Sequence, residues 1–237
     1  MEDFIVFSGK IYHETEICII DIYKLFNWYS SNYLKDHSLY AKAEKIKPSD
    51  FPSQIFSAHE FKIINNFKTL KKQFEWISAR TGLKHLVKKN FPYIPFKNIE
   101  TEKEKNGAPW LKNLPFLNIS ISHSGRYAVA AINKVQKIGM DLEKLKDINT
   151  KHILYAGFSG REIKNLSSKK YNEILKLWTI KESYLKYIRK GFNESLKKVE
   201  IIKNKIYYKN LPVENISIDS FFLLDNYVLS FVCEKIV

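Results

Sequence analysis

The strongest constraint on the fold lies in residues 117–143, where three short apolar segments follow one another with only brief polar breaks. The segments read LNISIS, YAVAAI and KIGMDLE, and they are separated by HSGR and NKVQ. Short apolar runs bounded by turn residues are typical of β-strands joined by tight connections. We therefore predict an antiparallel meander in this part of the chain.

The third segment carries an unusual polar face. Its apolar residues alternate with Gly139, Asp141 and Glu143, so these three share one face of the strand. Gly and Asp are poor strand formers, so solvation alone does not account for this face. Residues two apart in a strand are separated by roughly 7 Å at Cα, which lets Asp141 and Glu143 converge on one point. We expect Gly139 to leave room there for an approaching group.

A third acid lies on a long helix predicted over residues 171–189. Its apolar stripe includes Trp178, and Glu182 falls on the same stripe four residues later. If this stripe packs against the acidic strand, three carboxylates crowd together and require raised pKa values or a cation. Oxygen donors favour a hard divalent ion, of which Mg²⁺ is the natural choice. The simpler alternative is that the acids pair with lysines such as Lys186, one turn after Glu182.

Two capping boxes mark further helix starts, Ser57 with Glu60 and Ser159 with Glu162. Two prolines and a charged loop between residues 91 and 110 interrupt the pattern. We therefore expect an N-terminal subdomain over 1–115 and a C-terminal subdomain over 116–237 that carries the acidic site. The remaining expected elements are strands at 4–7 and 16–20, a helix within 23–40, helical structure from 57 to about 90, and strands from 199 to 233.

Composition narrows the functional classes. The chain has 237 residues, 45% hydrophobic and 14% aromatic, which suffices for a real core. Its formal charge of +14 points to an anionic partner. An equally weighted alternative is that the lysine-rich composition has no role in binding. With only four arginines, the surface suits diffuse attraction better than the reading of base edges. The absence of a long apolar run and the acidic start MEDFIV favour a cytoplasmic protein without membrane contact.

Two basic stretches complete the candidate site. The turn SISHSGR presents hydroxyls, the His123 imidazole and backbone N–H groups together, and such a turn can cradle an anion. A purely structural histidine is the alternative. The stretch FEWISARTGLK places Arg80 on a helix whose preceding turns carry Lys68, Lys71 and Lys72. The alternative is that these residues form only a solvated basic face.

Taken together, these motifs resemble a known family. GAPWLKNLPFLNISISHSGRYAVAAI, IGMDLEKLK and LWTIKESYLKYIRKG, in this order and spacing, are similar to 4′-phosphopantetheinyl transferases of the surfactin-synthetase-activating (Sfp) type. The resemblance covers residues 107–191. It implies an α/β (α+β) fold of two similar subdomains, each a small, mostly antiparallel sheet packed with a long helix, with coenzyme A in the cleft between them. The implied activity moves 4′-phosphopantetheine from coenzyme A to a serine of an apo acyl, peptidyl or aryl carrier protein and releases 3′,5′-ADP.

The resemblance also implies residue roles. Asp141, Glu143 and Glu182 match the family's Mg²⁺ ligands, with Mn²⁺ as an alternative ion. Lys186 matches the lysine that lies near the diphosphate and assists the leaving group. His123 matches a residue that contacts the phosphates. The expected catalytic residues are therefore Glu182, Lys186 and His123.

Further coenzyme contacts follow from the same comparison. Ser122 matches a phosphate-contacting residue, and Arg80 with Lys68 or a neighbouring lysine corresponds to the group that holds the 3′-phosphate. Gly107 lies in a turn that commonly reads Gly-Lys-Pro in the family, but here Ala108 replaces the lysine. One cation near the coenzyme is therefore missing.

The expected partner is an acidic apo carrier protein or carrier domain, because a basic enzyme suits it electrostatically. We expect a monomer that binds neither nucleic acid nor a membrane. One competing reading is a metal-dependent nuclease, whose common strand motif places a lysine where Leu145 stands here. Another is a basic nucleic-acid-binding module, for which only KNKIYYKN has the interleaved aromatic and basic pattern.

Overall fold

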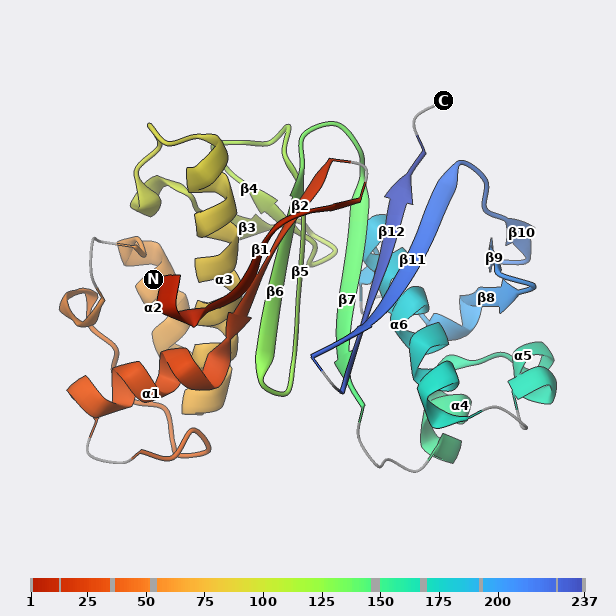
Figure 1. Cartoon of the computed structure of the whole chain (residues 1–237), viewed down its shortest axis with the longest axis horizontal. Helices are drawn as coiled ribbons and strands as arrows, with labels where there is room; N and C mark the ends of the chain where they lie inside the picture. The colour runs from red at the N-terminus through yellow and green to blue at the C-terminus, as the bar shows by residue number, and fades with distance from the viewer. Residues whose placement is uncertain are drawn as a thin grey trace. The chain divides into compact units, whose positions relative to one another are not determined.

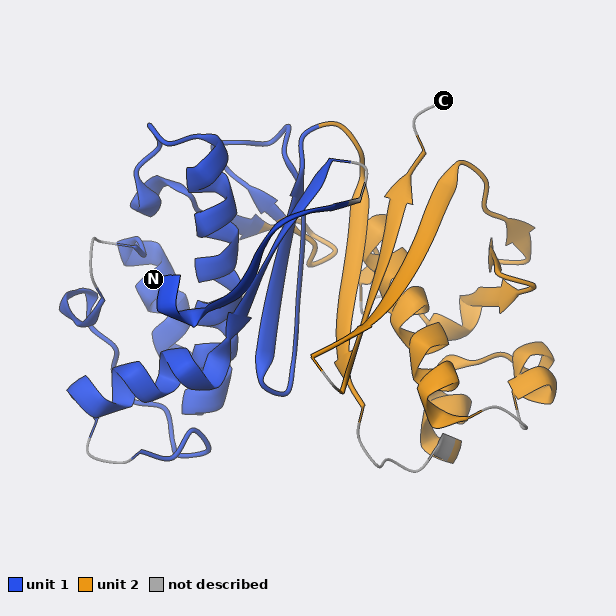
Figure 2. Ribbon diagram, in the orientation of Figure 1, with its two compact units in different colours: residues 1–102, 110–134 blue, residues 103–109, 135–237 orange. Residues whose placement is uncertain are grey.

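The computed structural model describes residues 2–12, 14–34, 37–51, 55–145, 150–166, 170–191, 194–224 and 226–235 (Figure 1). The chain divides into two compact units, unit 1 with residues 1–102 and 110–134, and unit 2 with residues 103–109 and 135–237 (Figure 2). Among the helices of the described ranges, none is both long and apolar enough to cross a membrane.

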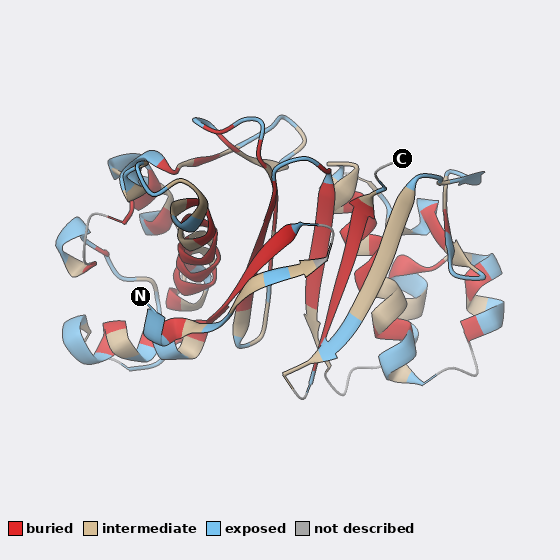
Figure 3. Ribbon diagram, turned by 45° about the horizontal axis from the view of Figure 1, so that its top comes forward, coloured by how far each residue is buried: buried red, intermediate tan, exposed pale blue. Residues whose placement is uncertain are grey.

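Unit 1 is built on a four-stranded antiparallel sheet in the order β1, β2, β6, β5. Helix α3 packs against β2, β5 and β6, and Figure 3 shows how much of it is buried. The β5–β6 turn contains Gly125 at a φ of +56°, a conformation that glycine adopts without a side-chain clash. The strands are β1 (Ile5–Tyr12), β2 (Thr15–Asp21), β5 (Asn118–Ser124) and β6 (Tyr127–Asn133).

Buried aromatic and aliphatic side chains fill the space between this sheet and the helices of unit 1. The capping box predicted at Ser57 is confirmed, because the Ser57 side chain accepts from the Glu60 backbone and the Glu60 carboxylate accepts from the Ser57 backbone. The helical elements are η1 (Glu2–Phe4), α1 (Ile22–Tyr33), η2 (Pro48–Asp50), α2 (Ala58–Asn65), α3 (Leu70–Asn90) and η4 (Phe96–Asn98). The short strands β3 (Thr101–Lys103) and β4 (Pro109–Leu111) pair with each other.

Unit 2 contains a three-stranded antiparallel sheet in the order β11, β12, β7, and helix α6 packs on β7 and β12. A second small sheet has the order β10, β9, β8. The strands are β7 (Ile138–Lys144), β8 (Val199–Ile202), β9 (Lys205–Tyr208), β10 (Leu211–Pro212), β11 (Ile216–Leu223) and β12 (Tyr227–Glu234). The helical elements are α4 (Thr150–Gly157), α5 (Gly160–Leu166), α6 (Tyr171–Tyr187) and η6 (Leu196–Lys198).

The predicted fold class is confirmed, since each unit combines an antiparallel sheet with one long helix, α3 or α6. The predicted three-strand meander is wrong in its third strand. β5 and β6 form a hairpin, but both edges of β6 are taken by β2 and β5, and β7 joins β12 in unit 2. The boundary expected after residue 115 consequently falls inside unit 1, because the β5–β6 hairpin completes that unit's sheet.

A buried ion pair anchors α2 to α3 in unit 1. Lys84 Nζ lies 2.8 Å from Glu60 Oε2, and both side chains are 1% exposed. The ammonium group also donates to the carbonyl oxygens of Phe96 and Ile99 at 3.0 and 2.6 Å. Its remaining neighbour is the ring of Phe56, whose centroid is 5.5 Å away. These partners offset only part of the cost of desolvation, because burial still raises the pKa of Glu60 and lowers the pKa of Lys84.

Unit 2 repeats this arrangement. Glu162, in the predicted capping box with Ser159, lies 2.7 Å from the Nζ of Lys181 on α6. Lys181 also donates to the Gly157 carbonyl at 2.6 Å and lies 4.3 Å from the centroid of the Phe158 ring. The sequences FSAHE and FSGRE thus begin the same buried module in both units.

Candidate functional site

The predicted acids lie on β7 and α6, which are joined tightly in unit 2. Asp141 is paired in register with Ser230 of β12. Ser183 of α6 donates its hydroxyl to the Ser230 carbonyl at 2.9 Å. The helix is therefore fastened to the sheet beside the position of Asp141.

Gly139 explains why α6 comes so close. A Cβ built on Gly139 would lie 2.0 Å from the Ser183 carbonyl oxygen and 2.3 Å from the backbone nitrogen of Tyr187. The room that we expected Gly139 to leave for a ligand is occupied by the helix backbone. Glycine is required here for strand and helix to carry their acids on facing surfaces.

Glu182 and Lys186 stand one turn apart on α6. Burial raises the pKa of Glu182 to about 7, and the nearby Asp141 and Glu143 carboxylates add to this increase, while Lys186 opposes it. Lys186 Nζ lies 2.7 Å from Asp141 Oδ1, so it bridges helix and strand. The three acids and the lysine therefore interact as one group, and the ion-pair alternative is present in the Lys186–Asp141 contact.

The donor set fits a hard divalent cation, because three carboxylates supply oxygen ligands and negative charge, and Asp141 and Glu143 contribute to the raised pKa of Glu182. Within the described residues, however, no three His, Cys, Asp or Glu side chains are already arranged around a common metal position. The Lys186 ammonium instead neutralises Asp141.

Ser122 and His123 lie at the end of β5, next to the Gly125 turn. As neighbours in a strand they point to opposite faces of the sheet, and Ser122 is buried whereas the His123 side chain is 39% exposed. His123 faces α3, where its Nδ1 lies 3.8 Å from Glu75 Oε2. The structure therefore does not bring these two side chains to one face, and only one of them is readily accessible.

The turn that follows His123 is held by an ion pair that the sequence analysis missed. Arg126 donates to Asp21 Oδ2 through Nε at 2.8 Å and approaches it through Nη2 at 2.7 Å. The other oxygen of Asp21 caps α1 by accepting from Tyr23 and Lys24. One buried carboxylate thus fixes both the start of α1 and the turn beside the candidate histidine.

Lys68 lines a basic hollow of about 530 Å³ in unit 1. The segment before α2 folds back beside it, because the Ala43 backbone donates to the Lys68 carbonyl and Asn65 bonds both backbone groups of Ile46. The other lining residues are Lys42, Ala43, Glu44, Lys45, Asn65 and Phe67. Lys42 and Lys45 were missed from the sequence, where nothing links them to Lys68.

Arg80 lies elsewhere on unit 1. It is about 15 Å along the α3 axis from the start of the helix at Leu70, by the rise of 1.5 Å per residue. Its Nε donates to Thr101 Oγ1 at 3.2 Å, and its guanidinium stacks on Trp76 at 4.8 Å from the ring centroid. Burial lowers its pKa to about 10, so it stays charged at neutral pH. The expectation that Arg80, with Lys68 or a neighbouring lysine, holds the 3′-phosphate stays a prediction.

Gly107 is exposed at the tip of a tight turn in unit 2, with a φ of +87°. Its backbone nitrogen donates to the Glu104 carbonyl at 2.8 Å. Arg189, just after α6, holds this turn through Glu104 Oε1 and the Pro109 carbonyl, each at 2.9 Å. The turn that lacks the family lysine is thus fastened to the helix that carries Glu182.

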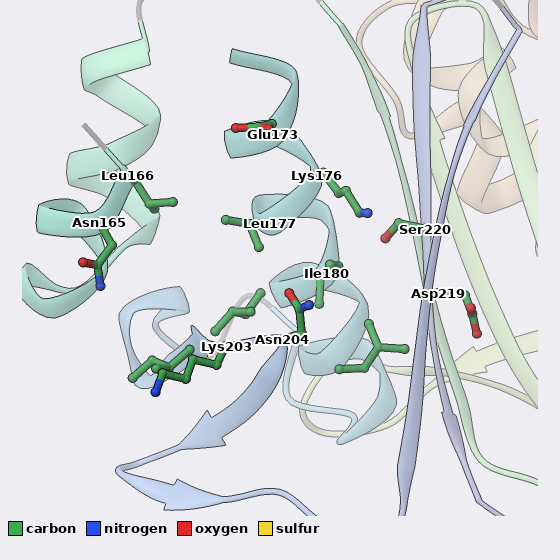
Figure 4. A pocket seen from close by; sticks show the side chains of 13 residues that line it. Asn165, Leu166, Glu173, Lys176, Leu177, Ile180, Lys203, Asn204, Asp219 and Ser220 are labelled. Atoms are coloured by element: carbon green, nitrogen blue, oxygen red, sulfur yellow. The ribbon is translucent and has the colours of Figure 1, made fainter. Parts of the chain in front are cut away.

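A separate cavity of about 760 Å³ opens in unit 2 between α5, α6, the β8–β9 turn and β11 (Figure 4). Both apolar and polar residues line it, including Leu177 and Ile180 on α6 and Lys203 at the turn. None of the predicted site residues lines it. Its position therefore does not support a role in the predicted chemistry.

The region that contains β7 and α6 is similar to known proteins. Residues 137–232 match the family profile of the 4′-phosphopantetheinyl transferase superfamily. The chain is 33% identical over 144 residues to the 4′-phosphopantetheinyl transferase gsp of Aneurinibacillus migulanus, covering 58% of this chain and 59% of that protein. It is 35% identical over 100 residues to the 4′-phosphopantetheinyl transferase Sfp of Bacillus subtilis (strain 168), covering 40% and 44%. For psf-1 of Bacillus pumilus the identity is 29% over 118 residues, covering 48% and 49%.

The matched part of the chain thus spans about half the length of these relatives. The family match begins at β7 and ends within β12, so it contains the strand and the helix that carry the acids. The resemblance to Sfp-type 4′-phosphopantetheinyl transferases is confirmed.

Proposed function

We propose that the chain is a 4′-phosphopantetheinyl transferase that moves the phosphopantetheine arm of coenzyme A to a serine of an apo carrier protein. The observation that carries the proposal is the group on β7 and α6, where Lys186 bonds Asp141 and the pKa of Glu182 is raised to about 7. A base with this pKa accepts a proton efficiently near neutral pH. The family match over residues 137–232 supports the same chemistry.

In the proposed reaction, the serine oxygen attacks the β-phosphorus of coenzyme A and the bond to the bridging oxygen of 3′,5′-ADP breaks. Glu182 accepts the serine proton. Lys186 donates to the departing phosphate oxygen, and His123 stabilises the charge that develops on the phosphates. Mg²⁺ held by Asp141, Glu143 and Glu182, or Mn²⁺ in its place, would neutralise diphosphate charge.

The basic hollow around Lys68 supports a site for the 3′-phosphate. Lys42, Lys45 and Lys68 line it against a single acid, Glu44, so the local charge attracts an anion. We also propose that Arg80 and Gly107 contribute to the coenzyme A site. The Arg80 guanidinium already contacts Thr101 and Trp76. Ser122 is assigned through its backbone, because its side chain is buried.

The remaining assignments follow from charge and from the expectations above. We propose an acidic carrier domain as the partner, because the +14 charge of the chain would accelerate its association with the enzyme. We further propose a cytoplasmic monomer that acts on neither nucleic acid nor membranes.

The decisive experiment incubates the protein with coenzyme A, Mg²⁺ and a panel of apo carrier proteins, and measures intact mass. We expect at least one carrier to gain one phosphopantetheine group, and we expect EDTA and Glu182→Gln to abolish the gain. Parallel incubation with DNA and RNA tests the nuclease alternative. Cleavage of nucleic acid without modification of any carrier would overturn the proposal.

A further inference from the structure

The cavity of about 760 Å³ in unit 2 lies along the edge of a strand. Ile218, Asp219 and Ser220, three consecutive residues of β11, line it. Consecutive side chains of a strand point to opposite faces of the sheet, and Figure 4 shows Asp219 and Ser220 on opposite sides of β11. A cavity that contacts all three residues therefore meets β11 at its edge, where the backbone is within reach.

This edge of β11 is regular and open. The strand pairs with β12 from Ile216 to Leu223 without a register shift, and it is the last strand of its sheet. Within the described ranges, no other strand and no recorded backbone hydrogen bond occupies its outer edge. Proteins commonly protect such an edge with a lysine, a proline or a bulge, and the sequence ISIDSFFL contains none of these. An edge of this kind is a template for one more strand.

The side of the cavity opposite β11 is formed by the end of β8 and the β8–β9 turn, residues 201–204. The Ile201 backbone N–H there already donates to Glu162 Oε1 at 2.9 Å. The open backbone groups are therefore those of β11. A second copy of the chain would bring its own β12 together with β11, and the β8–β9 turn lies on the side to which that sheet would extend. The cavity thus favours a single extended chain over a second copy.

Helix α6 forms the floor between these two sides. The lining residues Glu173, Lys176, Leu177 and Ile180 have the spacing of one helix face. Leu177 and Ile180 give this face an apolar patch (Figure 4). A strand added to β11 would direct every second side chain toward α6, so apolar residues at alternate positions suit this floor.

The charged groups around the cavity favour an acidic segment. Lys176 extends toward Ser220 of β11, and Lys203 lies on the opposite side (Figure 4). Asp219 points to the other face of its strand, which leaves Glu173 as the acid on the α6 face. A carboxylate of the bound segment would therefore find a cation on either side.

We infer that this cavity binds an extended, acidic segment of a partner protein, which adds to β11 as a strand and places apolar side chains over Leu177 and Ile180. Main-chain hydrogen bonds to β11 supply affinity, and the alternating side chains supply specificity. The group formed by Asp141, Glu182 and Lys186 does not line this cavity, so the inference does not rest on the proposed function.

The test uses a synthetic peptide of about nine residues, enough to span β11, in which valine alternates with threonine and glutamate. Two derivatives carry backbone N-methyl groups, one at the odd and one at the even positions. An added strand directs only alternate N–H groups toward its neighbour. By calorimetry, one derivative should therefore bind more than roughly tenfold more weakly than the parent, and the other should bind like it. Equal loss in both derivatives, or no binding of the parent peptide, would overturn the inference.

Charge variants provide the second readout. Lys176→Glu should weaken binding of the peptide by roughly fivefold, and a peptide with lysine in place of glutamate should instead prefer this variant. The matched control is Lys24→Glu, an exposed position on α1 of unit 1 that changes the net charge equally and should not affect binding. Equal effects of the two variants would show that only the overall charge attracts the peptide, against the inference.

Amide hydrogen exchange locates the bound peptide. Alternate amides of β11 should exchange rapidly in the free chain and become protected when the peptide binds, whereas β1, which ends the sheet of unit 1, should not change. Protection at β1 instead of β11 would place the peptide elsewhere. If the β11 amides are protected without peptide and ultracentrifugation detects dimers, a second copy occupies the edge and the inference is wrong.

Discussion

Glu182→Gln should stabilise the protein at alkaline pH while it removes the proposed base. The pKa of Glu182 is raised from 4.5 to about 7, first by burial and then by Asp141. An acid whose pKa is raised in the folded state weakens folding as pH rises, because the unfolded chain ionises first. The penalty is absent well below pH 4.5, grows between pH 4.5 and about 7, and is complete above that range.

The magnitude follows from the pKa difference. A difference of about 2.5, at about 1.36 kcal/mol for each pKa unit, gives a penalty of about 3 kcal/mol at pH 8. At pH 5 the same two pKa values leave less than about 1 kcal/mol. Glu182 is only partly buried, so solvent screening makes these figures upper values.

Urea unfolding followed by circular dichroism, in EDTA at pH 5 and pH 8, measures the effect. The free energy of unfolding of Glu182→Gln should exceed that of the wild type by about 2 to 3 kcal/mol at pH 8 and by less than about 1 kcal/mol at pH 5. Glu173→Gln, an exposed position on the same helix, is the matched control and should change little at either pH.

Excess Mg²⁺ should raise the stability of the wild type at pH 8 and have a smaller effect on Glu182→Gln, because a bound ion stabilises only the folded chain. If Glu182→Gln is no more stable than the wild type at pH 8 in EDTA, the electrostatic description of the acidic group is wrong.

Three further predictions concern packing and charge. Gly139→Ala should lower the free energy of unfolding by at least about 1 to 3 kcal/mol, because its Cβ would overlap α6. The control Gly160→Ala should not lower it, because a Cβ there meets open space. Urea titration measures both variants, and equal effects would contradict the packing argument. Lys84→Met should cost about 3 to 5 kcal/mol by leaving Glu60 buried and unpaired, and adding Glu60→Gln should recover part of that loss in the same assay. Raising the ionic strength should increase KM for an acidic carrier with little change in kcat, because salt screens the attraction. A KM that does not depend on salt would show that the +14 charge does not assist carrier binding.

Local signals in the sequence predicted local structure well. The capping boxes at Ser57 and Ser159 are formed, because each depends on residues only three apart. The hairpin around Gly125 was also recognisable, since its turn and both strands are contiguous. The proximity of Glu182 to Asp141 followed from one apolar stripe on the helix and one polar face on the strand, and the raised pKa of Glu182 reflects it.

Long-range features escaped prediction for a common physical reason. A short apolar strand does not encode its partner, so β7 was expected beside β6 and instead pairs with β12. The hollow around Lys68 depends on a chain segment that folds back through Asn65, which has no periodic signature.

The contact at Gly139 also limits how this site can change during evolution. Because the backbone of α6 occupies the volume that a Cβ would need, no larger residue at this position is compatible with the present spacing of helix and strand. The close spacing of the two backbones therefore depends on the absence of a side chain at residue 139. Exchanging aspartate and glutamate, which differ by one methylene, would alter the site without moving the strand and the helix that carry the acids.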